Sequence, residues 1–492
     1  MNILLIYPKF PDTFWSFSYA LPFIGKKAAF PPLGLITVAA LLPGKFQIRL
    51  VDLNVNGLTD DDLSWADMAF ISAMAVQRKS AVHVIDRCKA SGLKIVAGGP
   101  LFTAEPNAFE QVDHLVLNEA EATLPAFLTD LKNGCPKKIY NADGYPDMHQ
   151  SPIPLWGLID TRRYASLNIQ YSRGCPFNCE FCNITALFGR TPRIKTPRQI
   201  IAELDAIYQT GWRGNIFFVD DNFIGNKRAI KEHLLPALIQ WRKDKKGCSF
   251  FTEASINLAD DPELMANMAA AGFDSVFIGI ETPDANSLTE CGKTHNKNRD
   301  LLQDVKKIHR YGLQVMGGFI VGFDSDPPSI FQRQIDFIQQ SGIVTAMVGM
   351  LQAPPGTRLF ERLASEHRVS EEFSGDNVDG RTNIIPAMGM DKLIEGYHTI
   401  MQQIYSPRQY YQRVRRVLVE LKAPVAIAPV DWQRILAFWR ASLRLGILGK
   451  ERFQYWRLLT WTLARRPKLL PLAVTLAIYG YHYRRVCELH IL

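Results

Sequence analysis

Three cysteines stand close together in one short segment of this 492-residue chain: Cys175, Cys179 and Cys182. Their C-x-x-x-C-x-x-C spacing allows a single loop to supply three thiolates, which are the ligands that iron-sulfur clusters require. A cubane held by three cysteines keeps one iron free of protein ligands. The spacing therefore predicts a 4Fe-4S cluster with an open iron, and it makes these cysteines both the predicted metal ligands and the predicted catalytic residues.

The residues alone leave two other interpretations open. A tetrahedral zinc site would need a fourth Cys or His from a distant part of the chain, because none follows at a short interval. The three thiols could also be ordinary buried side chains. The other cysteines are scattered along the chain and indicate no disulfide framework, so we expect plain thiols at Cys88, Cys135, Cys248, Cys291 and Cys487.

The cysteine loop resembles that of the radical S-adenosylmethionine (radical SAM) superfamily, since the aromatic Phe181 directly precedes the last cysteine. The resemblance implies that the open iron binds the amino and carboxylate groups of S-adenosylmethionine (SAM). It also implies cleavage of SAM to a 5'-deoxyadenosyl radical, which removes a hydrogen atom from an unactivated carbon. Phe181 would then pack near the adenine.

The core around this loop is predicted over residues 166–365, where strand and helix patterns alternate. Apolar runs at 167–171, 215–219, 249–255, 275–280, 314–321 and 345–351 are the strand candidates. Six such strands fit the partial (β/α)6, TIM-like barrel that the resemblance implies. The chemistry of such barrels lies where the strands end.

Polar residues follow several of these strands. We expect Asp220, Glu253 and Glu281 to bind SAM, with Ser255 beside them as a further cofactor contact. The competing interpretation for each acid is a helix cap or a first-turn residue, both common after strands.

Two positions depart from the superfamily pattern. Asp220-Asp221-Asn222 replaces the usual Gly-Gly-Glu, and Ser325 stands where G-x-I-x-G-x-x-E has its Glu. Gly318 and Gly322 of that pattern are retained, and the resemblance implies that the adenine lies against the strand there.

Residues 1–140 alternate short apolar runs with helical patterns, which predicts a flavodoxin-like or Rossmann-like parallel sheet. The runs are 3–7, 48–53, 68–72, 94–97 and 114–117. A long connection at 8–32 is rich in aromatic residues, and loops of this length are usually functional or disordered. Its aromatic content favours function.

Two segments of this part are Phe30-Pro31-Pro32-Leu33-Gly34 and Val51-Asp52-Leu53-Asn54. With them, the part resembles the cobalamin-binding domain that precedes many radical SAM cores. We expect Gly98, Gly99 and Glu119 to contact the cofactor, because they follow strands at the ligand-binding edge. The D-x-H-x-x-G motif, which supplies a lower axial histidine in some cobalamin proteins, is absent. His83 and His114 lack that context, so we expect a cobalamin without a protein histidine on its cobalt.

A linker is predicted at 141–165, where prolines gather, and a helical, basic C-terminal domain at 366–492. Residues 408–492 hold 16 basic and 4 acidic side chains, which gives this segment a net charge of +12. Because the whole chain has a net charge of +8, the preceding residues carry −4. This tail suits either helices lying on an anionic membrane or a helical cap packed on the barrel. The apolar stretch 469–479 is too short to cross a bilayer. We expect no nucleic-acid partner, since no recognised module is present.

The resemblance, which reaches the hopanoid methylase group, predicts a cobalamin-dependent radical SAM methyltransferase. We expect it to methylate an unactivated carbon of a hydrophobic, lipid-like substrate, with flavodoxin or ferredoxin as electron donor. The alternatives are a carbon-carbon bond-forming or ring-modifying enzyme without methyl transfer, and a cobalamin-binding sensor or carrier. The N-terminus has no signal-peptide pattern, which predicts a cytoplasmic protein, either free or peripheral on the inner membrane face.

Overall fold

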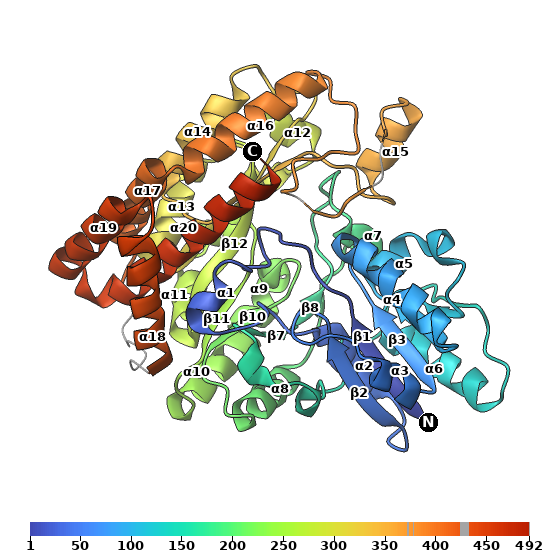
Figure 1. Ribbon diagram of the computed structural model, residues 1–492. Helices are drawn as coiled ribbons and strands as arrows, with labels where there is room; N and C mark the ends of the chain where they lie inside the picture. The colour runs from blue at the N-terminus through green and yellow to red at the C-terminus, as the bar shows by residue number, and fades with distance from the viewer. Residues whose placement is uncertain (371–372, 377, 424–431, 492) are drawn as a thin grey trace.

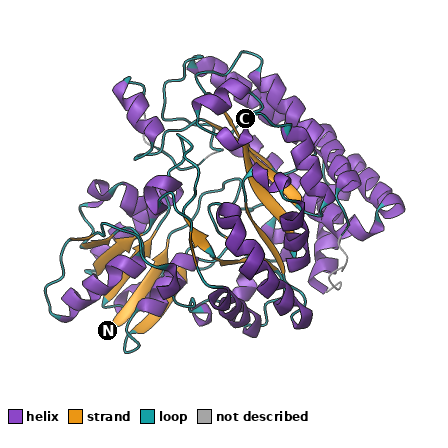
Figure 2. Cartoon of the chain, turned by 180° about the vertical axis from the view of Figure 1, so that it is seen from behind, coloured by secondary structure: helices purple, strands orange, loops and turns teal. Residues whose placement is uncertain are grey.

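The computed structural model describes residues 1–370, 373–376, 378–423 and 432–491. It contains two parallel six-stranded sheets and a helical C-terminal region (Figure 1). The N-terminal sheet lies at one end of the molecule and the C-terminal helices lie at the other, as both views show (Figures 1 and 2). The predicted α/β class, with its sheet domain, partial barrel and helical domain, is confirmed.

The N-terminal sheet has the strand order β2-β1-β3-β4-β5-β6, and every neighbouring pair is parallel. Its first five positions follow the flavodoxin-like order, in which ligands bind beyond the carboxyl ends of the strands. Apolar strands form because helices bury both faces of the sheet. The strands are β1 (Asn2–Tyr7), β2 (Gln47–Asp52), β3 (Met68–Ser72), β4 (Lys94–Gly98), β5 (His114–Val116) and β6 (Ile139–Tyr140).

The helices of this domain cover the two faces separately. One face packs against α2 (Leu33–Leu41) and α6 (Ala120–Lys132). The other packs against α3 (Asp60–Trp65), α4 (Arg78–Ala90) and α5 (Pro100–Ala104).

The second sheet is an open barrel whose six parallel strands follow one another in chain order, with β7 and β14 as its edges. The strands are β7 (Leu167–Ile169), β10 (Asn215–Phe218), β11 (Ser249–Glu253), β12 (Phe273–Glu281), β13 (Gln314–Val321) and β14 (Ala346–Met350). The connecting helices are α8 (Pro197–Gln209), α10 (Leu235–Asp244), α11 (Pro262–Ala271), α13 (Leu301–Arg310) and α14 (Ile330–Ser341).

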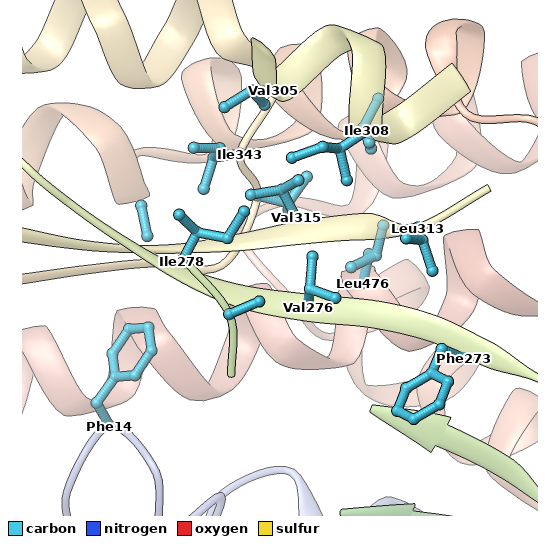
Figure 3. Close-up of a cluster of buried hydrophobic side chains, with 14 of the residues drawn as sticks. Phe14, Phe273, Val276, Ile278, Val305, Ile308, Leu313, Val315, Ile343 and Leu476 are labelled. Atoms are coloured by element: carbon cyan, nitrogen blue, oxygen red, sulfur yellow. The ribbon is translucent and has the colours of Figure 1, made fainter. Parts of the chain in front are cut away.

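The outer face of this sheet forms the main core. Figure 3 shows Val276 and Ile278 of β12 and Val315 of β13 beside Val305 and Ile308 of α13, all completely buried. Because side chains alternate along a strand, the residues between them face the inside of the barrel.

In the described residues, the C-terminal region contains five α-helices: α16 (Met390–Tyr405), α17 (Pro407–Glu420), α18 (Trp432–Ala441), α19 (Arg452–Arg465) and α20 (Leu470–His490). Helix α16 packs on α14, and α17 packs on α13 and α14, so part of this region caps the barrel as one of the two predicted interpretations has it. Of the helices in the described residues, none has both the length and the apolar character that a membrane crossing requires.

The aromatic connection at 8–32 packs between the barrel and helix α20. The Phe14 ring stacks on Tyr483 with their centroids 4.1 Å apart. The His482 Nε2 donates to the Phe14 carbonyl at 3.0 Å. A short helix in this connection, α1 (Leu21–Ile24), contacts α18. The N-terminal segment therefore joins the barrel to the C-terminal helices.

Candidate functional site

The cysteine loop begins and ends in a short antiparallel hairpin of β8 (Ser172–Arg173) and β9 (Arg193–Ile194). Gly174 lies between β8 and the first cysteine with φ +94°. A Cβ there would meet three carbonyl oxygens at 2.9–3.0 Å, those of Phe188, Gly189 and Thr191. The backbone N–H of Cys175 donates to the Gly189 carbonyl at 3.2 Å. Glycine is therefore required where the loop folds back on itself.

Two acids at the end of β10 hold the start of this loop. Asp220 accepts hydrogen bonds from the backbone N–H groups of Tyr171, at 3.1 Å, and Ser172, and from the Ser172 hydroxyl at 2.5 Å. Asp221 accepts from the Gly174 N–H at 3.0 Å. Burial raises the pKa of Asp220 to about 7. The structure thus gives Asp220, a predicted SAM contact, a set of partners in the loop itself.

The opposite side of the loop is held by the turn after α12 (Ala285–Glu290) and by α15 (Arg358–Ser365). The Glu180 N–H donates to the Cys291 carbonyl at 2.9 Å, and Arg358 donates to the Asn178 carbonyl at 2.6 Å. Arg362 forms an ion pair with Glu180 at 2.8 Å. The three-cysteine segment is therefore fixed on both sides by the barrel.

A buried lysine lies beside the cysteines. Lys293 Nζ is 2.5 Å from Glu281 Oε1, and the two side chains are 12% and 8% exposed. Burial opposes the charged form, but the Glu281 carboxylate outweighs it and raises the pKa of Lys293 above its usual range. Glu281 itself has φ +62°, at an irregularity in β12. The structure therefore places Glu281, another predicted SAM contact, in an ion pair next to the thiols.

Glu253 differs from the other acids because it has no hydrogen-bond or ion-pair partner among the described residues. It ends β11 on the inner face, in the same cross-strand row as Phe277 and Met316. Burial, together with the nearby Asp221 and Asp220, raises its pKa to about 8. Ser255 lies two residues on, where its N–H donates to Asn222 Oδ1 at 3.2 Å. Glu253 is thus available to a ligand.

Gly318 in β13 and Gly322 directly after it occupy positions that do not suit a residue with a side chain. A Cβ on Gly318 would come within 2.8 Å of the Phe277 ring, and Gly322 has φ +106°. Asp326 accepts hydrogen bonds from the Gly322 and Phe323 N–H groups at 2.9 and 3.2 Å. At Ser325, where the superfamily has Glu, the N–H donates to Glu290 at 2.7 Å. A carboxylate from α12 thus binds the turn in which a local one was expected.

The predicted cobalamin contacts lie at the carboxyl edge of the N-terminal sheet. A Cβ on Gly98 would be 2.6 Å from the Val116 carbonyl oxygen, and one on Gly99 would be 2.6 Å from Ser72 Oγ. Neither position accommodates a side chain, so the backbone is uncovered here. We call these two residues the bare edge.

Glu119 connects this edge to the cysteine loop. Its carboxylate is 2.5 Å from Arg173 and 2.6 Å from Arg193, and Arg173 also binds Glu121 at 2.9 Å. All four side chains are less than a fifth exposed. Because Arg173 lies two residues before Cys175, the carboxyl edges of the two sheets face each other across this ionic cluster.

The site contains residues that the sequence pattern did not single out: Lys293, Arg173, Arg193 and the aromatic inner face of the barrel. Lys293 is one of 56 Lys and Arg residues, and nothing in its spacing relates it to a cysteine more than one hundred residues earlier. Only the fold brings these groups together.

Comparisons with known proteins agree with this geometry. Residues 169–338 match the model of the radical SAM superfamily, and residues 357–491 match a domain of unknown function, DUF4070. An uncharacterized methyltransferase of Synechocystis is 40% identical, over 99% of this chain and 92% of that protein. The hopanoid C-2 methylase of Rhodopseudomonas palustris is 35% identical, over 93% of this chain and 88% of that protein.

Solved structures share the fold. The cobalamin-dependent SAM radical enzyme OxsB aligns with a TM-score of 0.63 at 15% identity, over 99% of this chain and 80% of that one. The radical SAM methyltransferase TsrM of Kitasatospora setae aligns with a TM-score of 0.56 at 14% identity, over 75% and 79%.

This chain belongs to the cobalamin-dependent radical SAM methyltransferase family. Membership implies a 4Fe-4S cluster and SAM, and the residues present fit both. One loop carries three free thiols beside the charge of Lys293, and Glu253 has no partner in the part of the chain that the structure describes. Within the described residues no three acidic, His or Cys side chains converge on a single-ion site. A cubane does not need such convergence, because its sulfur ligands bind different irons.

Proposed function

We propose that this chain methylates an unactivated carbon of an apolar, lipid-like substrate. The observation that carries the proposal is the inner face of the barrel. There large apolar side chains are only partly buried, while neighbours on the outer face, such as Ile216, Phe250 and Val276, are completely buried. The partly buried set is Phe217, Phe251, Phe277, Met316 and Met347. A relative with 35% identity, whose name states methylation of a hopanoid, supports the same substrate class.

The inner face is built from rings and thioethers. Phe217 and Phe251 stack with centroids 4.6 Å apart, and Phe30 packs on both. Trp15 lies edge-on to Phe277 at 5.5 Å, and its indole N–H points at Met347 Sδ, 3.0 Å away. A rigid apolar wall of this kind favours hydrocarbon over polar groups.

Residues at the strand ends and in the cysteine loop would hold the cluster and SAM. Cys175, Cys179 and Cys182 would hold the cluster, and Phe181 would lie near the SAM adenine. Glu253 would accept the SAM amino group, since it has no protein partner in the described part of the chain. Lys293 would balance the negative charge of the cluster. When bound, the cofactors supply the radical and the methyl group.

Cobalamin would lie at the bare edge formed by Gly98 and Gly99, on the side that faces the cysteine loop. Neither histidine of the N-terminal domain lies at the carboxyl ends of the strands, where that edge is formed. His83 is exposed on α4, and His114 begins β5 at the opposite edge, where its Nδ1 is 2.7 Å from the Lys137 carbonyl. We therefore propose cobalt without a protein histidine.

The experiment follows a labelled methyl group. The full chain, reconstituted anaerobically with iron, sulfide and cobalamin, is incubated with methyl-labelled SAM, a reduced flavodoxin or ferredoxin, and a bacterial lipid extract. We expect label in the lipid fraction. SAM cleavage without labelled product would favour a ring-modifying enzyme, and no SAM turnover at all would favour a sensor or carrier.

A matched pair of variants tests the substrate class. Phe277→Ala removes a ring from the inner face, whereas Phe273→Ala removes one from the outer core of the same strand. We expect the first to lower methylation while leaving SAM cleavage intact. Equal loss of both reactions in Phe277→Ala would count against an apolar substrate at this wall.

A further inference from the structure

The C-terminal helices leave a long apolar surface uncovered. Large side chains recur every three or four residues along α18 and the π-helical turn that follows it (Ser442–Ile447), and they continue into α19. Four of them are strongly exposed: Trp432 at 74%, Trp439 at 66%, Leu448 at 75% and Phe453 at 76%. We call this set the apolar stripe: Trp432, Ile435, Trp439, Leu443, Ile447, Leu448, Phe453 and Trp456.

The opposite face of the same helices is well packed. Ala437, Ala441 and Leu445 are buried, and on α19 Tyr455 and Leu458 are completely buried. The Trp456 indole N–H donates to the Gly446 carbonyl at 3.0 Å, which ties α19 to the end of the π-helical turn. The helices are therefore held in place by packing on one face while they present apolar side chains to solvent on the other. Large exposed apolar patches mark interaction surfaces.

Positive charge accompanies the apolar stripe. Residues 432–468 contain nine Lys and Arg side chains and one acid, Glu451, which gives +8. Glu451 is 6% exposed and is bound by Arg484, so it presents no negative charge to the outside. Lys450, Arg465 and Lys468 are exposed and form no ion pair among the described residues.

A basic groove adjoins the same helix. It lies between α17 and α19 and has a volume of about 630 Å³. Four arginines, Arg408, Arg415, Arg416 and Arg457, line it together with Trp461 and a single acid, Glu420. Arg415 stacks on the Trp461 ring at 4.9 Å. Burial and the nearby Arg457 lower the pKa of Arg415. An anion in this groove would relieve that repulsion.

We propose that this end of the molecule docks on an anionic phospholipid bilayer. The apolar stripe enters the interface between headgroups and acyl chains, and the surrounding cations contact lipid phosphates. A second copy of this chain fits the surface less well, because pairing two such faces would bring their cations together.

The docked face lies next to the segment that reaches the barrel. Arg440 of α18 donates to the Phe23 carbonyl of α1 at 3.2 Å. Arg444 of the π-helical turn lies over the Phe23 ring at 5.6 Å. The same connection carries Trp15 and Phe30 onto the inner face. A bilayer bound here would therefore hold an apolar substrate close to the wall that receives it, a step that rests on the proposed function.

Vesicle flotation of the full chain tests the docking, with vesicles of phosphatidylcholine alone and of phosphatidylcholine with phosphatidylglycerol. The stripe variant is Trp439→Ser, Leu448→Ser and Phe453→Ser. Its control is Ile153→Ser, Leu155→Ser and Ile385→Ser, three apolar residues that are 40–50% exposed elsewhere on the surface. A charge variant carries Lys450→Glu and Lys468→Glu. Thermal melting confirms that all variants fold.

We expect the wild type and the control to float with the anionic vesicles. The stripe variant should lose roughly tenfold or more in binding, because three apolar side chains no longer leave water. The charge variant should lose roughly fivefold or more per cation. Unchanged flotation of the stripe variant would overturn the proposal. The proposal would also be overturned if the wild type formed a dimer in the absence of vesicles and the stripe variant did not. Flotation needs neither iron nor SAM, so its outcome is independent of methyl transfer.

Discussion

The acids at the strand ends of the barrel perform different tasks although their sequence context is alike. Asp220 and Asp221 bind the backbone of the cysteine loop, Glu281 pairs with Lys293, and Glu253 has no partner in the described residues. Each follows an apolar strand, so spacing alone predicts a polar edge without saying which carboxylate meets a ligand. The tertiary partners decide that question.

Lys293→Met tests the ion pair beside the cysteines. The substitution leaves the Glu281 carboxylate buried without a partner, which should destabilise the iron-free protein by roughly 3–5 kcal/mol. The midpoint of urea unfolding measures this.

The control is the double variant Lys293→Met with Glu281→Gln, which removes both charges and should recover much of the loss. An unfolding midpoint for Lys293→Met equal to that of the wild type would show that the pair does not stabilise the fold.

Among single residues, the cysteines allowed the most specific prediction from the sequence. Their spacing is local, so a single loop can reveal it. The partners of Glu119 and Glu281 could not be predicted in the same way, because Arg193 and Lys293 approach them only after two sheets and several turns have formed.

At the scale of elements, the cysteine loop depends on the backbone geometry of its hairpin. Gly174→Ala should prevent iron incorporation for two reasons. The added Cβ would lie 2.9–3.0 Å from three carbonyl oxygens, and a φ of +94° is unfavourable for alanine. Iron content after anaerobic reconstitution measures the effect.

Gly211→Ala is the matched control. Gly211 has φ +85°, but no atom lies within 4 Å of the position that its Cβ would take, so only the backbone cost of about 1–2 kcal/mol applies. We expect normal iron content there. Normal iron content in Gly174→Ala as well would mean that the hairpin tolerates the extra atom.

Helix α20 should make stability depend on pH. Burial lowers the pKa of His482 to about 4, against about 6.5 in the unfolded chain. The neutral ring therefore contributes fully above about pH 6.5, and its contribution falls as pH drops toward 4, at most by about 1.4 kcal/mol per pH unit.

His482→Gln keeps a donor for the Phe14 carbonyl but cannot take up a proton. Urea unfolding at neutral and mildly acidic pH should show a shallower pH dependence for this variant than for the wild type. Identical slopes would mean that His482 does not titrate differently in the two states.

Long apolar runs predicted all the longer strands to within a few residues, because each forms a buried strand of a parallel sheet. The two-residue strands β6, β8 and β9 escaped prediction, since two residues show no periodicity. The contact between Phe14 and Tyr483 escaped it too, because it joins segments more than four hundred residues apart and no local pattern encodes it.

At the scale of the whole molecule, the carboxyl edges of the two sheets face each other, and the Glu119–Arg173–Arg193 cluster links them beside the cysteine loop. Such an arrangement would place two cofactors on opposite sides of one reaction space, with the apolar inner face of the barrel beside it. The C-terminal helices lie on the side of the barrel that is opposite to the N-terminal sheet, and they carry the proposed membrane surface (Figure 1).

We expect the three-cysteine loop to bind a cluster that cleaves SAM in support of methyl transfer. The most direct measurement compares wild type and Cys179→Ala after anaerobic reconstitution, by iron content and by the products of SAM. We predict iron in the wild type, together with release of both 5'-deoxyadenosine and S-adenosylhomocysteine. We predict neither product from the variant. Wild-type protein that stays colourless and iron-free, or a variant that still yields 5'-deoxyadenosine, would contradict it.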